Sequence, residues 1–218
     1  MKQPLVIAPL VIAIDGPAAA GKGTLARRLA AHLGLPHLDT GLLYRAVARR
    51  LLDAGENPAD GAAAEAAART LQPPDWDRPD LRTPEVDRAA SLVAAEPRVR
   101  AALLAFQRRF PGARGAVMDG RDIGTVIFPD APVKLFVTAT PDARAERRFL
   151  ELRHRGIQSD PAAIAAEIAE RDAQDESRPV GPLRRARDAI LIDTTALDPD
   201  AAFAAALAAI SARIAAQQ

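Results

Sequence analysis

Residues 16–24 are the strongest chemical signal in the sequence. They read Gly-Pro-Ala-Ala-Ala-Gly-Lys-Gly-Thr and match the G-x-x-x-x-G-K pattern of phosphate-binding loops. In such loops glycines let backbone N–H groups wrap phosphate oxygens, and the lysine ammonium reaches the outer phosphates. The alternative is a tight turn with a surface lysine, which the flanking strand and helix patterns disfavour. The pattern predicts that the following residues bind a nucleotide: Gly16, Pro17, Ala18, Ala19, Ala20, Gly21, Lys22, Gly23 and Thr24.

The residue after the lysine departs from the usual loop. Gly23 stands where a magnesium-binding hydroxyl normally follows Lys22, so the metal ligand is either Thr24 or water. A GTP switch would also need an Asn-Lys-x-Asp motif, and neither Lys2 nor Lys134 lies in one. The sequence therefore disfavours a GTPase.

Two further polar clusters follow apolar runs. In the first, Thr40, Tyr44 and Arg45 lie within one turn of a predicted helix, so a hydroxyl and a guanidinium can meet an anion. The bland alternative for this cluster is an N-cap threonine with a surface arginine. The second cluster reads Asp-Gly-Arg-Asp-Ile-Gly-Thr over residues 119–125. Its glycines suit a backbone that approaches a substrate closely, and a salt-bridged turn is the alternative.

Short apolar runs and helical periodicity predict the elements that position these residues. Strands are expected at 11–14, 115–118, 133–138 and 189–192, with a weaker one at 37–38, and helical stretches lie between them. This alternation predicts an α/β fold with a parallel five-stranded sheet and helices on both faces. Ligands of such sheets gather at the carboxyl ends of the strands, where all three clusters fall.

The chain is expected to divide into a core and two helical covers. The core comprises residues 1–56, 115–141 and 183–218, ending in a closing helix over 200–216. Residues 57–114, the insert, hold helices and a proline-rich loop at 71–84. Residues 142–182 hold two arginine-rich helices, over 142–155 and 161–175. Both covers are candidates for mobile segments.

Composition excludes several classes of protein. The 218 residues are 49% hydrophobic and 26% charged, which suits a globular protein. The net charge of +1 argues against a basic nucleic-acid surface. There are no cysteines and only three scattered histidines, so thiolate chemistry is excluded and a histidine metal site is disfavoured. The longest apolar run, residues 5–14, contains Pro9 and is too short to span a bilayer. We expect a cytoplasmic protein.

Several motifs in the same order resemble the bacterial cytidylate kinase family, whose members phosphorylate CMP and dCMP from ATP. Besides residues 16–24, the resemblance covers Asp-Thr-Gly-x-x-Tyr-Arg at 39–45, Arg-Thr-Pro-Glu-Val at 82–86 and Pro-Arg-Val-Arg at 97–100. It continues through residues 119–125, 128–134 and 171–178. The resemblance implies a P-loop nucleoside monophosphate kinase fold, in which the insert binds the monophosphate and residues 142–182 form a lid over ATP.

The resemblance also implies roles for single residues. Ser91, Arg100 and Asp122 would read cytosine, and a carboxylate suits the exocyclic amine that uracil lacks. The remaining residues of the CMP pocket would hold the monophosphate and sugar: Thr40, Tyr44, Arg45, Asp119, Arg121, Arg171, Asp175 and Arg178, with Lys22, Arg121 and Arg178 catalytic. The lid residues Arg144 and Arg148 would contact ATP, and a solvated arginine face explains them equally well.

One departure from the family concerns the insert. The familiar enzymes carry a small antiparallel sheet there, but the proline spacing of residues 71–84 defeats a paired strand. We therefore expect a short ordered connection without that sheet.

Two rival functions remain open at this stage. One is another small-molecule P-loop kinase acting on UMP, AMP or a non-nucleotide acceptor, and the other is a nucleotide-binding regulatory module. The preferred prediction is a monomeric kinase that uses ATP with Mg²⁺ to phosphorylate CMP or dCMP, with no nucleic-acid or membrane partner.

Overall fold

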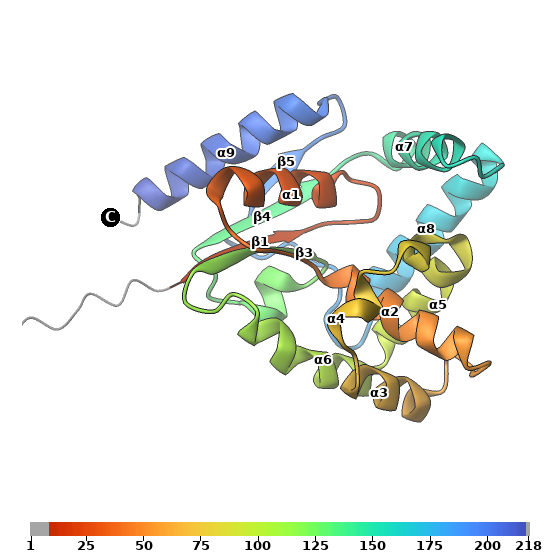
Figure 1. Ribbon diagram of the computed structural model, residues 1–218. Helices are drawn as coiled ribbons and strands as arrows, with labels where there is room; N and C mark the ends of the chain where they lie inside the picture. Colours follow the sequence, from red (N-terminus) through yellow and green to blue (C-terminus); the bar gives the residue numbers. More distant parts are fainter. Residues whose placement is uncertain (1–8, 217–218) are drawn as a thin grey trace, which may run out of the picture.

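A single parallel sheet lies at the centre of the computed structural model, which describes residues 9–216 (Figure 1). Its strands are β1 (Leu10–Asp15), β2 (His37–Asp39), β3 (Gly115–Gly120), β4 (Val133–Thr138) and β5 (Ile190–Asp193). Their order across the sheet is β2-β3-β1-β4-β5, and every pairing is parallel. All five predicted strands are confirmed, with ends shifted by at most two residues. Residues 5–8 of the apolar run lie outside the described residues.

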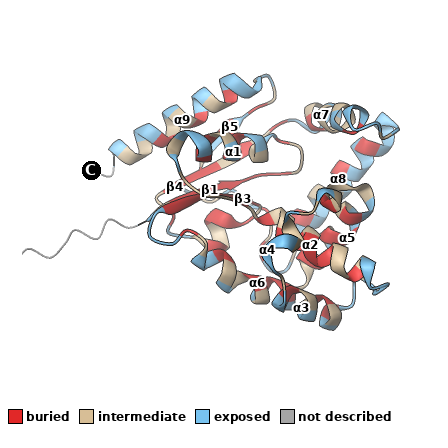
Figure 2. Cartoon of the chain, viewed as in Figure 1, coloured by how far each residue is buried: buried red, intermediate tan, exposed pale blue. Residues whose placement is uncertain are grey.

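The two faces of the sheet are both covered, as the alternation in β1 shows. Val11 and Ala13 point into one core with α2 (Thr40–Asp53), α5 (Pro84–Ala95) and α6 (Pro97–Arg109). Ile12 and Ile14 point into the other core with α1 (Lys22–Leu33) and α9 (Pro199–Ala215). Side chains of a strand alternate between faces, so a strand covered on both faces is apolar throughout. Figure 2 shows the central strands β1 and β3 mostly buried and the outer faces of α8 and α9 exposed.

The insert is helical and contains no strand among its described residues. It forms α3 (Gly61–Arg69), α4 (Pro73–Trp76), a 3₁₀ turn η1 (Pro79–Arg82), α5 and α6. The expected absence of the small sheet is confirmed. The expected loop is wrong in detail, because Pro73, Pro79 and Pro84 each begin a helical turn. Proline suits the first helical position, where its fixed φ fits and no N–H is needed.

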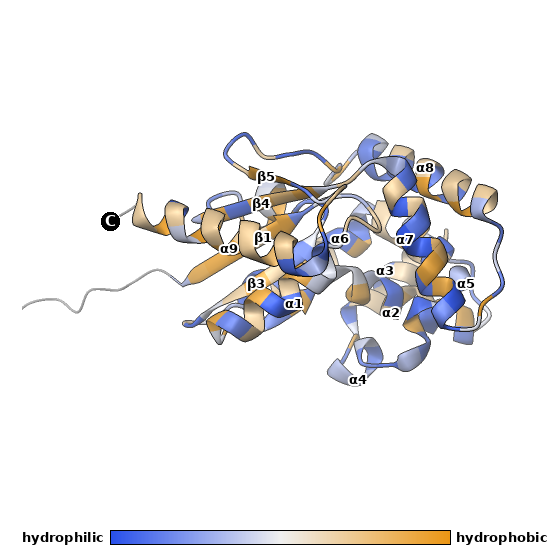
Figure 3. Ribbon diagram, turned by 90° about the horizontal axis from the view of Figure 1, so that it is seen from above, coloured by the Kyte–Doolittle hydropathy of each residue, from blue (hydrophilic) through white to orange (hydrophobic). Residues whose placement is uncertain are grey.

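Two helices form a separate cover at the far end of the molecule from the C-terminus (Figure 3). They are α7 (Pro141–His154) and α8 (Pro161–Ser177), which share a small core of Leu152, Ile164 and Ile168. Helix α8 also packs against α5 of the insert. The two helical covers therefore meet above the sheet edge. No helix within residues 9–216 is long and apolar enough to cross a membrane.

Candidate functional site

The phosphate-binding loop follows β1 directly. Gly16 has φ 153°, and a Cβ there would lie 2.0 Å from the carbonyl oxygen of Val137, so only glycine fits. Gly21 precedes α1 in the left-handed region, and no described side chain caps this helix N-terminus. Its free N–H groups and partial positive charge suit an anion. Lys22 Nζ lies 3.1 Å from the carbonyl oxygen of Pro17, which holds the ammonium over the loop.

A cavity of about 980 Å³ lies between this loop and the two helical covers. That volume is at the upper end of the range for small-molecule sites. It brings together most of the predicted residues from distant parts of the chain: Ala18, Ala19, Ala20, Gly21, Lys22, Gly23, Thr24, Thr40, Tyr44, Arg45, Ser91, Arg100, Asp119, Arg121, Asp122, Arg148, Arg171 and Arg178. Gly16, Pro17, Arg144 and Asp175 are the predicted residues that do not line it.

One part of the cavity wall is rich in buried arginines. Arg121 donates to Asp175 at 2.6 Å, and Arg178 pairs with the same carboxylate. Asp175 is 1% exposed, holds both arginines in place and does not line the cavity. The sugar-facing role that the resemblance implied stays a prediction. Burial and the charge of Arg121 lower the pKa of Arg178 to about 10 and that of Arg171 to about 9. Such mutual repulsion favours binding of a dianion.

Lys22 belongs to the same positive region. Burial lowers the pKa of its ammonium well below the usual range, and nearby Arg121 adds to this effect. Asp119 and Asp39 oppose the shift. An anionic ligand beside Lys22 would restore the charged form, because an opposite charge favours ionisation.

A second cluster, on the side of the insert, places a buried carboxylate beside a guanidinium and an aromatic ring. Arg100 pairs with Asp122, and its guanidinium lies 5.6 Å from the ring centre of Tyr44. Both charged residues are buried, with 7% and 4% exposed. Gly181 packs on the pair so closely that a Cβ there would meet Arg100 Nη2 at 2.3 Å. The carboxylate and guanidinium together offer an acceptor beside donors, which a cytosine edge requires.

Helix α5 and helix α6 carry the insert's contribution to this cluster. Ser91 lies on α5 and donates to the carbonyl oxygen of Asp87 at 3.2 Å. Arg100 lies on α6, and the helices break at Glu96, whose carboxylate caps α6. The prediction that helical turns with one break hold Ser91 and Arg100 at the same pocket is confirmed.

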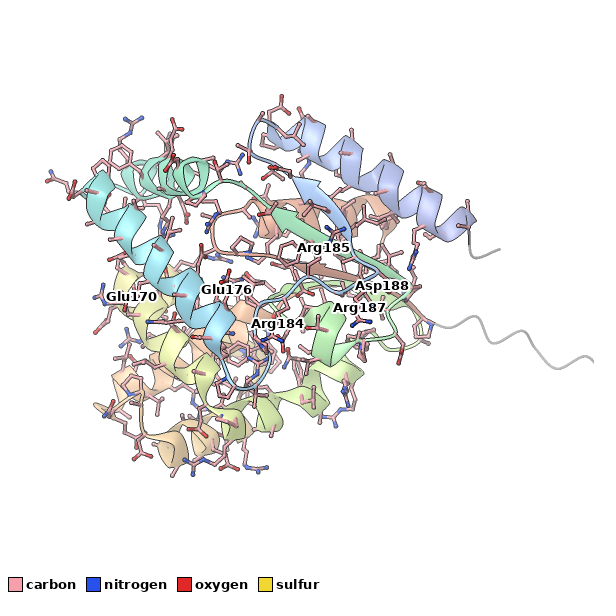
Figure 4. All side chains as sticks on the ribbon, turned by 180° about the vertical axis from the view of Figure 1, so that it is seen from behind. Glu170, Glu176, Arg184, Arg185, Arg187 and Asp188 are labelled. Carbon is pink, nitrogen blue, oxygen red and sulfur yellow. The ribbon has the colours of Figure 1, made fainter. Side chains whose placement is uncertain are left out.

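The segment after α8 completes this wall. It runs from the end of α8 to β5 and carries Arg184, Arg185, Arg187 and Asp188 on the outside (Figure 4). These four are exposed and are absent from the cavity lining, whereas Gly181, earlier on the same segment, packs on the Arg100–Asp122 pair. The left-handed φ of 63° at Gly181 turns the backbone at this contact.

The loop that carries Arg121 and Asp122 is tied to the end of β1. The carboxylate of Asp15 accepts from the backbone N–H groups of Ile123 and Gly124, each at 2.7 Å. Burial raises the pKa of Asp15 to about 7, against the lowering effect of these two hydrogen bonds. The loop then enters a π-helical turn, η2 (Ile123–Ile127). Asp15 was not singled out from the sequence, although its place at a strand end pointed there.

In the Thr40 cluster, neither an N-cap threonine nor a surface arginine is found. Asp39, not Thr40, is the N-cap of α2 and accepts from Gly41 N–H at 3.0 Å. Thr40 Oγ1 instead donates to the carbonyl oxygen of Asp119 at 2.9 Å. An N-cap threonine is therefore wrong, because the carboxylate takes the cap and frees the hydroxyl to join α2 to β3. Arg45 lines the cavity and is not a surface residue.

The arginines of α7 separate into different environments. Arg144 is 4% exposed and donates to the carbonyl oxygens of Ala139 and Ala18 and to Asp172, so its donors are used within the protein. Arg148 lines the cavity and contacts Asp87. Arg147, for which no role was predicted, also lines the cavity and donates to Thr194 Oγ1 at 3.0 Å. Helical spacing alone does not distinguish these three environments.

Oxygen ligands for a hard cation are present beside the loop. Thr24 is exposed in the cavity, and its hydroxyl has only a long contact of 3.5 Å from Arg27. Asp119 Oδ2 lies 3.6 Å from where a Cβ of Gly23 would be, while Oδ1 contacts His37. No group of three or more acidic or histidine side chains in residues 9–216 forms a metal cage. Mg²⁺ commonly binds through one or two protein oxygens plus phosphates, and Thr24 and Asp119 supply oxygens of that kind.

The fold and the cavity together define a class. A five-stranded parallel sheet, a phosphate loop between β1 and α1, and an arginine-rich cavity under two helical covers are the features of a P-loop kinase of the nucleoside monophosphate kinase type.

Comparisons with known proteins agree with this class. The family model described as Cytidylate kinase matches residues 12–212. The "Cytidylate kinase" of Granulibacter bethesdensis is 64% identical over 194 residues, covering 89% of this chain and 93% of that protein. That of Acidiphilium cryptum is 63% identical over 198 residues, covering 91% and 93%. A crystal structure of an uncharacterized protein from Eubacterium ventriosum has a TM-score of 0.54 at 18% identity, covers 93% of this chain and 98% of its own, and supports the fold alone. The chain belongs to the cytidylate kinase family.

Proposed function

We propose that this protein transfers the γ-phosphoryl group of ATP to the 5′-phosphate of CMP or dCMP, forming ADP and CDP or dCDP. The observation that carries the proposal is one cavity in which a phosphate loop faces the Arg100–Asp122 pair across a set of buried arginines. Family membership supports the same activity. Phosphoryl transfer needs little covalent chemistry from the protein, so positioning and charge neutralisation carry the catalysis.

The donor phosphates belong on the loop of residues 16–24. Backbone N–H groups at the start of α1 would hold the inner phosphates, and Lys22 would reach the transferred group. Mg²⁺, when bound, supplies charge neutralisation between the donor phosphates, and Thr24 and Asp119 are the protein oxygens that would hold it. We assign Arg148 to the donor side and Arg147 to the neighbouring wall beside Thr194. Arg144 takes the role of joining α7 to the loop at Ala18.

The acceptor belongs between the insert and β3. Arg45, Arg121 and Arg178 would bind the 5′-phosphate, with Asp175 holding two of these guanidinium groups. Asp122 would accept from the exocyclic amine of cytosine while Arg100 and Ser91 serve its acceptor atoms. Uracil presents a carbonyl in place of that amine, so the carboxylate rejects it. Arg171, Thr40 and Tyr44 complete this pocket.

The remaining proposals concern the division of the chain and the state of the protein in the cell. We keep the division into a core, a monophosphate-binding insert of residues 57–114 and a lid of residues 142–182. A monomeric, cytoplasmic enzyme without nucleic-acid or membrane partners stays a prediction.

A panel of acceptors with purified enzyme tests the proposal. With ATP and Mg²⁺, we expect CMP and dCMP to give ADP at rates at least about tenfold above UMP and AMP, because one well-placed polar contact is worth about that factor. A preference for UMP or AMP would favour another P-loop kinase. ATP binding without any acceptor-dependent ADP release would favour a regulatory module.

A further inference from the structure

One carboxylate of the insert contacts arginines from three other helices. Asp87 lies in the first turn of α5, and its side chain is 13% exposed. Its Oδ1 accepts from Arg45 Nε of α2 at 2.9 Å, and its Oδ2 accepts from Arg148 Nη2 of α7 at 2.6 Å. Arg171 of α8 lies 3.9 Å from Oδ1. Helix α5 packs against both α2 and α8, and Figure 1 shows the three helices on the same side of the molecule.

The three arginines serve different parts of the proposed reaction. Arg45 is assigned to the acceptor phosphate, Arg148 to the donor side and Arg171 to the acceptor pocket. Asp87 is therefore a single anionic group shared between the two substrate sites. Asp87 was not predicted as a site residue, although it lies four residues before Ser91 and so shares a helix face with that residue.

The local electrostatics make this shared position significant. Burial acts to raise the pKa of Asp87, yet Arg45, Arg171 and Arg148 together hold that pKa below its usual value. Burial lowers the pKa of Arg171, and the charges of Arg121 and Arg45 lower it further. Removal of the Asp87 charge would leave Arg45 with Asp39 as its main acidic neighbour, and Asp39 is already bound by Arg82 at 2.7 Å.

A general helix-terminus effect does not account for these contacts. Glu85 occupies the same first turn of α5, where any acidic side chain interacts favourably with the helix dipole. Its side chain is 62% exposed, and its only ion pair among the described residues is a long one of 3.5 Å with Arg49. Glu85 thus provides the dipole contribution without any contact to the arginines of the site. It is a matched control for Asp87.

We propose that Asp87 is a positioning residue for both substrates, which orients Arg45 toward the acceptor phosphate and attaches Arg148 of α7 to the insert. Binding of one nucleotide then favours binding of the other, because each stabilises the same arrangement of α5 and α7. This inference rests on the proposed function.

The first test measures this coupling directly by binding. Isothermal titration calorimetry gives the Kd of a non-hydrolysable ATP analogue with Mg²⁺, in the absence and in the presence of saturating CMP. In the parent protein we expect CMP to lower that Kd by about fivefold or more, within the usual range of coupling between sites. In Asp87→Asn the ratio falls to near one and KM for CMP rises severalfold, whereas in Glu85→Gln neither changes. A circular dichroism melt confirms that each variant is folded.

A double-mutant cycle provides an independent test. Arg148→Gln alone should remove the coupling, and adding Asp87→Asn should then remove no further coupling, because both changes break the same contact between Asp87 and Arg148. Arg153→Gln, an exposed arginine of the same helix that lies over Phe149, should leave the coupling unchanged.

Several results would overturn the inference. One is an Asp87→Asn variant that retains the coupling, and another is a parent protein without coupling. A third is tighter CMP binding in Asp87→Asn, which would make the carboxylate a competitor of the phosphate. Failure of the proposed function is a separate result, since CMP would then give no ADP whatever the coupling.

Discussion

The sheet side and the helical side of the cavity are stabilised by different kinds of contact. On the sheet side, the groups near the reacting phosphates are tied through the backbone: Asp15 accepts from two consecutive N–H groups, and Thr40 donates to a carbonyl oxygen. On the helical side, ion pairs and single contacts join α7 and α8 to the insert. Arg148 meets Asp87, and Arg155 donates to the carbonyl oxygen of Arg82 at 2.7 Å.

The difference has a physical consequence. The backbone hydrogen bonds on the sheet side are fixed by β1 and β3, which are buried apart from Leu10 and cannot shift without exposing the core. Side-chain ion pairs between helices exchange partners without disturbing a core. We therefore expect substitutions on the sheet side to affect chemistry and stability most, and those on the helical side to affect substrate binding and specificity.

The largest effect is expected at Lys22. Lys22→Met should lower kcat by about 100-fold or more, because the transferred phosphoryl group loses its fixed cation. Steady-state kinetics with CMP and ATP measure this, and the melting temperature should stay near that of the parent. Lys134→Met is the contrasting variant, since Lys134 pairs with Asp188 away from the cavity and should affect melting more than kcat. A Lys22→Met enzyme with near-parent turnover would contradict the role of the loop.

Asp15 should give the next largest effect, on stability as a function of pH. Its folded-state pKa of about 7 lies above the ordinary 3.8, so the folded protein binds the proton more tightly than the unfolded chain. The stabilisation is therefore full below about pH 4 and is lost as the pH rises toward about 7. A shift of about three units corresponds to ~4 kcal/mol.

Urea unfolding of the parent and Asp15→Asn isolates this contribution, because all other titrating groups are shared. The unfolding free energy of the parent, relative to the variant, should fall by a few kcal/mol between pH 4 and pH 7.5. Asp130→Asn, on an exposed turn, is the control variant. A flat result for Asp15→Asn would contradict the raised pKa.

Specificity should depend on Asp122, where the two walls meet. Asp122→Asn replaces one carboxylate oxygen by an amide N–H₂, which can donate to the carbonyl of uracil. We expect the ratio of kcat/KM for CMP to that for UMP to narrow by about 10- to 100-fold, the value of one hydrogen bond to a charged group. KM for ATP should change little, and an unchanged ratio would place base recognition elsewhere.

The smallest effect is expected at the outer edge of the insert. Arg78 pairs with Asp53 and Asp80 at 2.7 and 2.6 Å, but all three side chains are at least one-third exposed. Exposed ion pairs contribute about 0 to 1 kcal/mol, so Arg78→Gln should leave kinetics unchanged and stability nearly so. Thermal unfolding at low and high salt measures this, and a loss of several kcal/mol would show that the insert depends on that pair.

Many of the elements that form the two walls could be predicted from the sequence. The five strands, the phosphate loop and the helices of both covers follow from apolar runs, glycines and periodicity, which are local signals. The proline-rich stretch of residues 71–84 was predicted correctly as unable to pair as a strand, but not as helical turns, because proline at a first helical position and proline in a loop look alike in sequence.

The site was predictable as a set of residues more than as an arrangement. Motif spacing identified many of the residues that line the cavity, including Lys22, Arg121 and Asp122, but not Asp87 or Arg147. It did not separate Arg144, whose donors are used within the protein, from Arg148, which faces the cavity. Spacing on a helix gives a shared face, whereas the partner of that face depends on how the helices pack.

The sequence by itself determined the phosphate loop and the alternation of strands and helices, because both depend on residues close together in the chain. Only the tertiary structure decided that Asp15 holds the loop of Asp122 and that Asp87 joins Arg45 to Arg148. These partners are 108, 42 and 61 positions apart, and a contact between side chains so far apart in the sequence exists only after the sheet and the covers have packed.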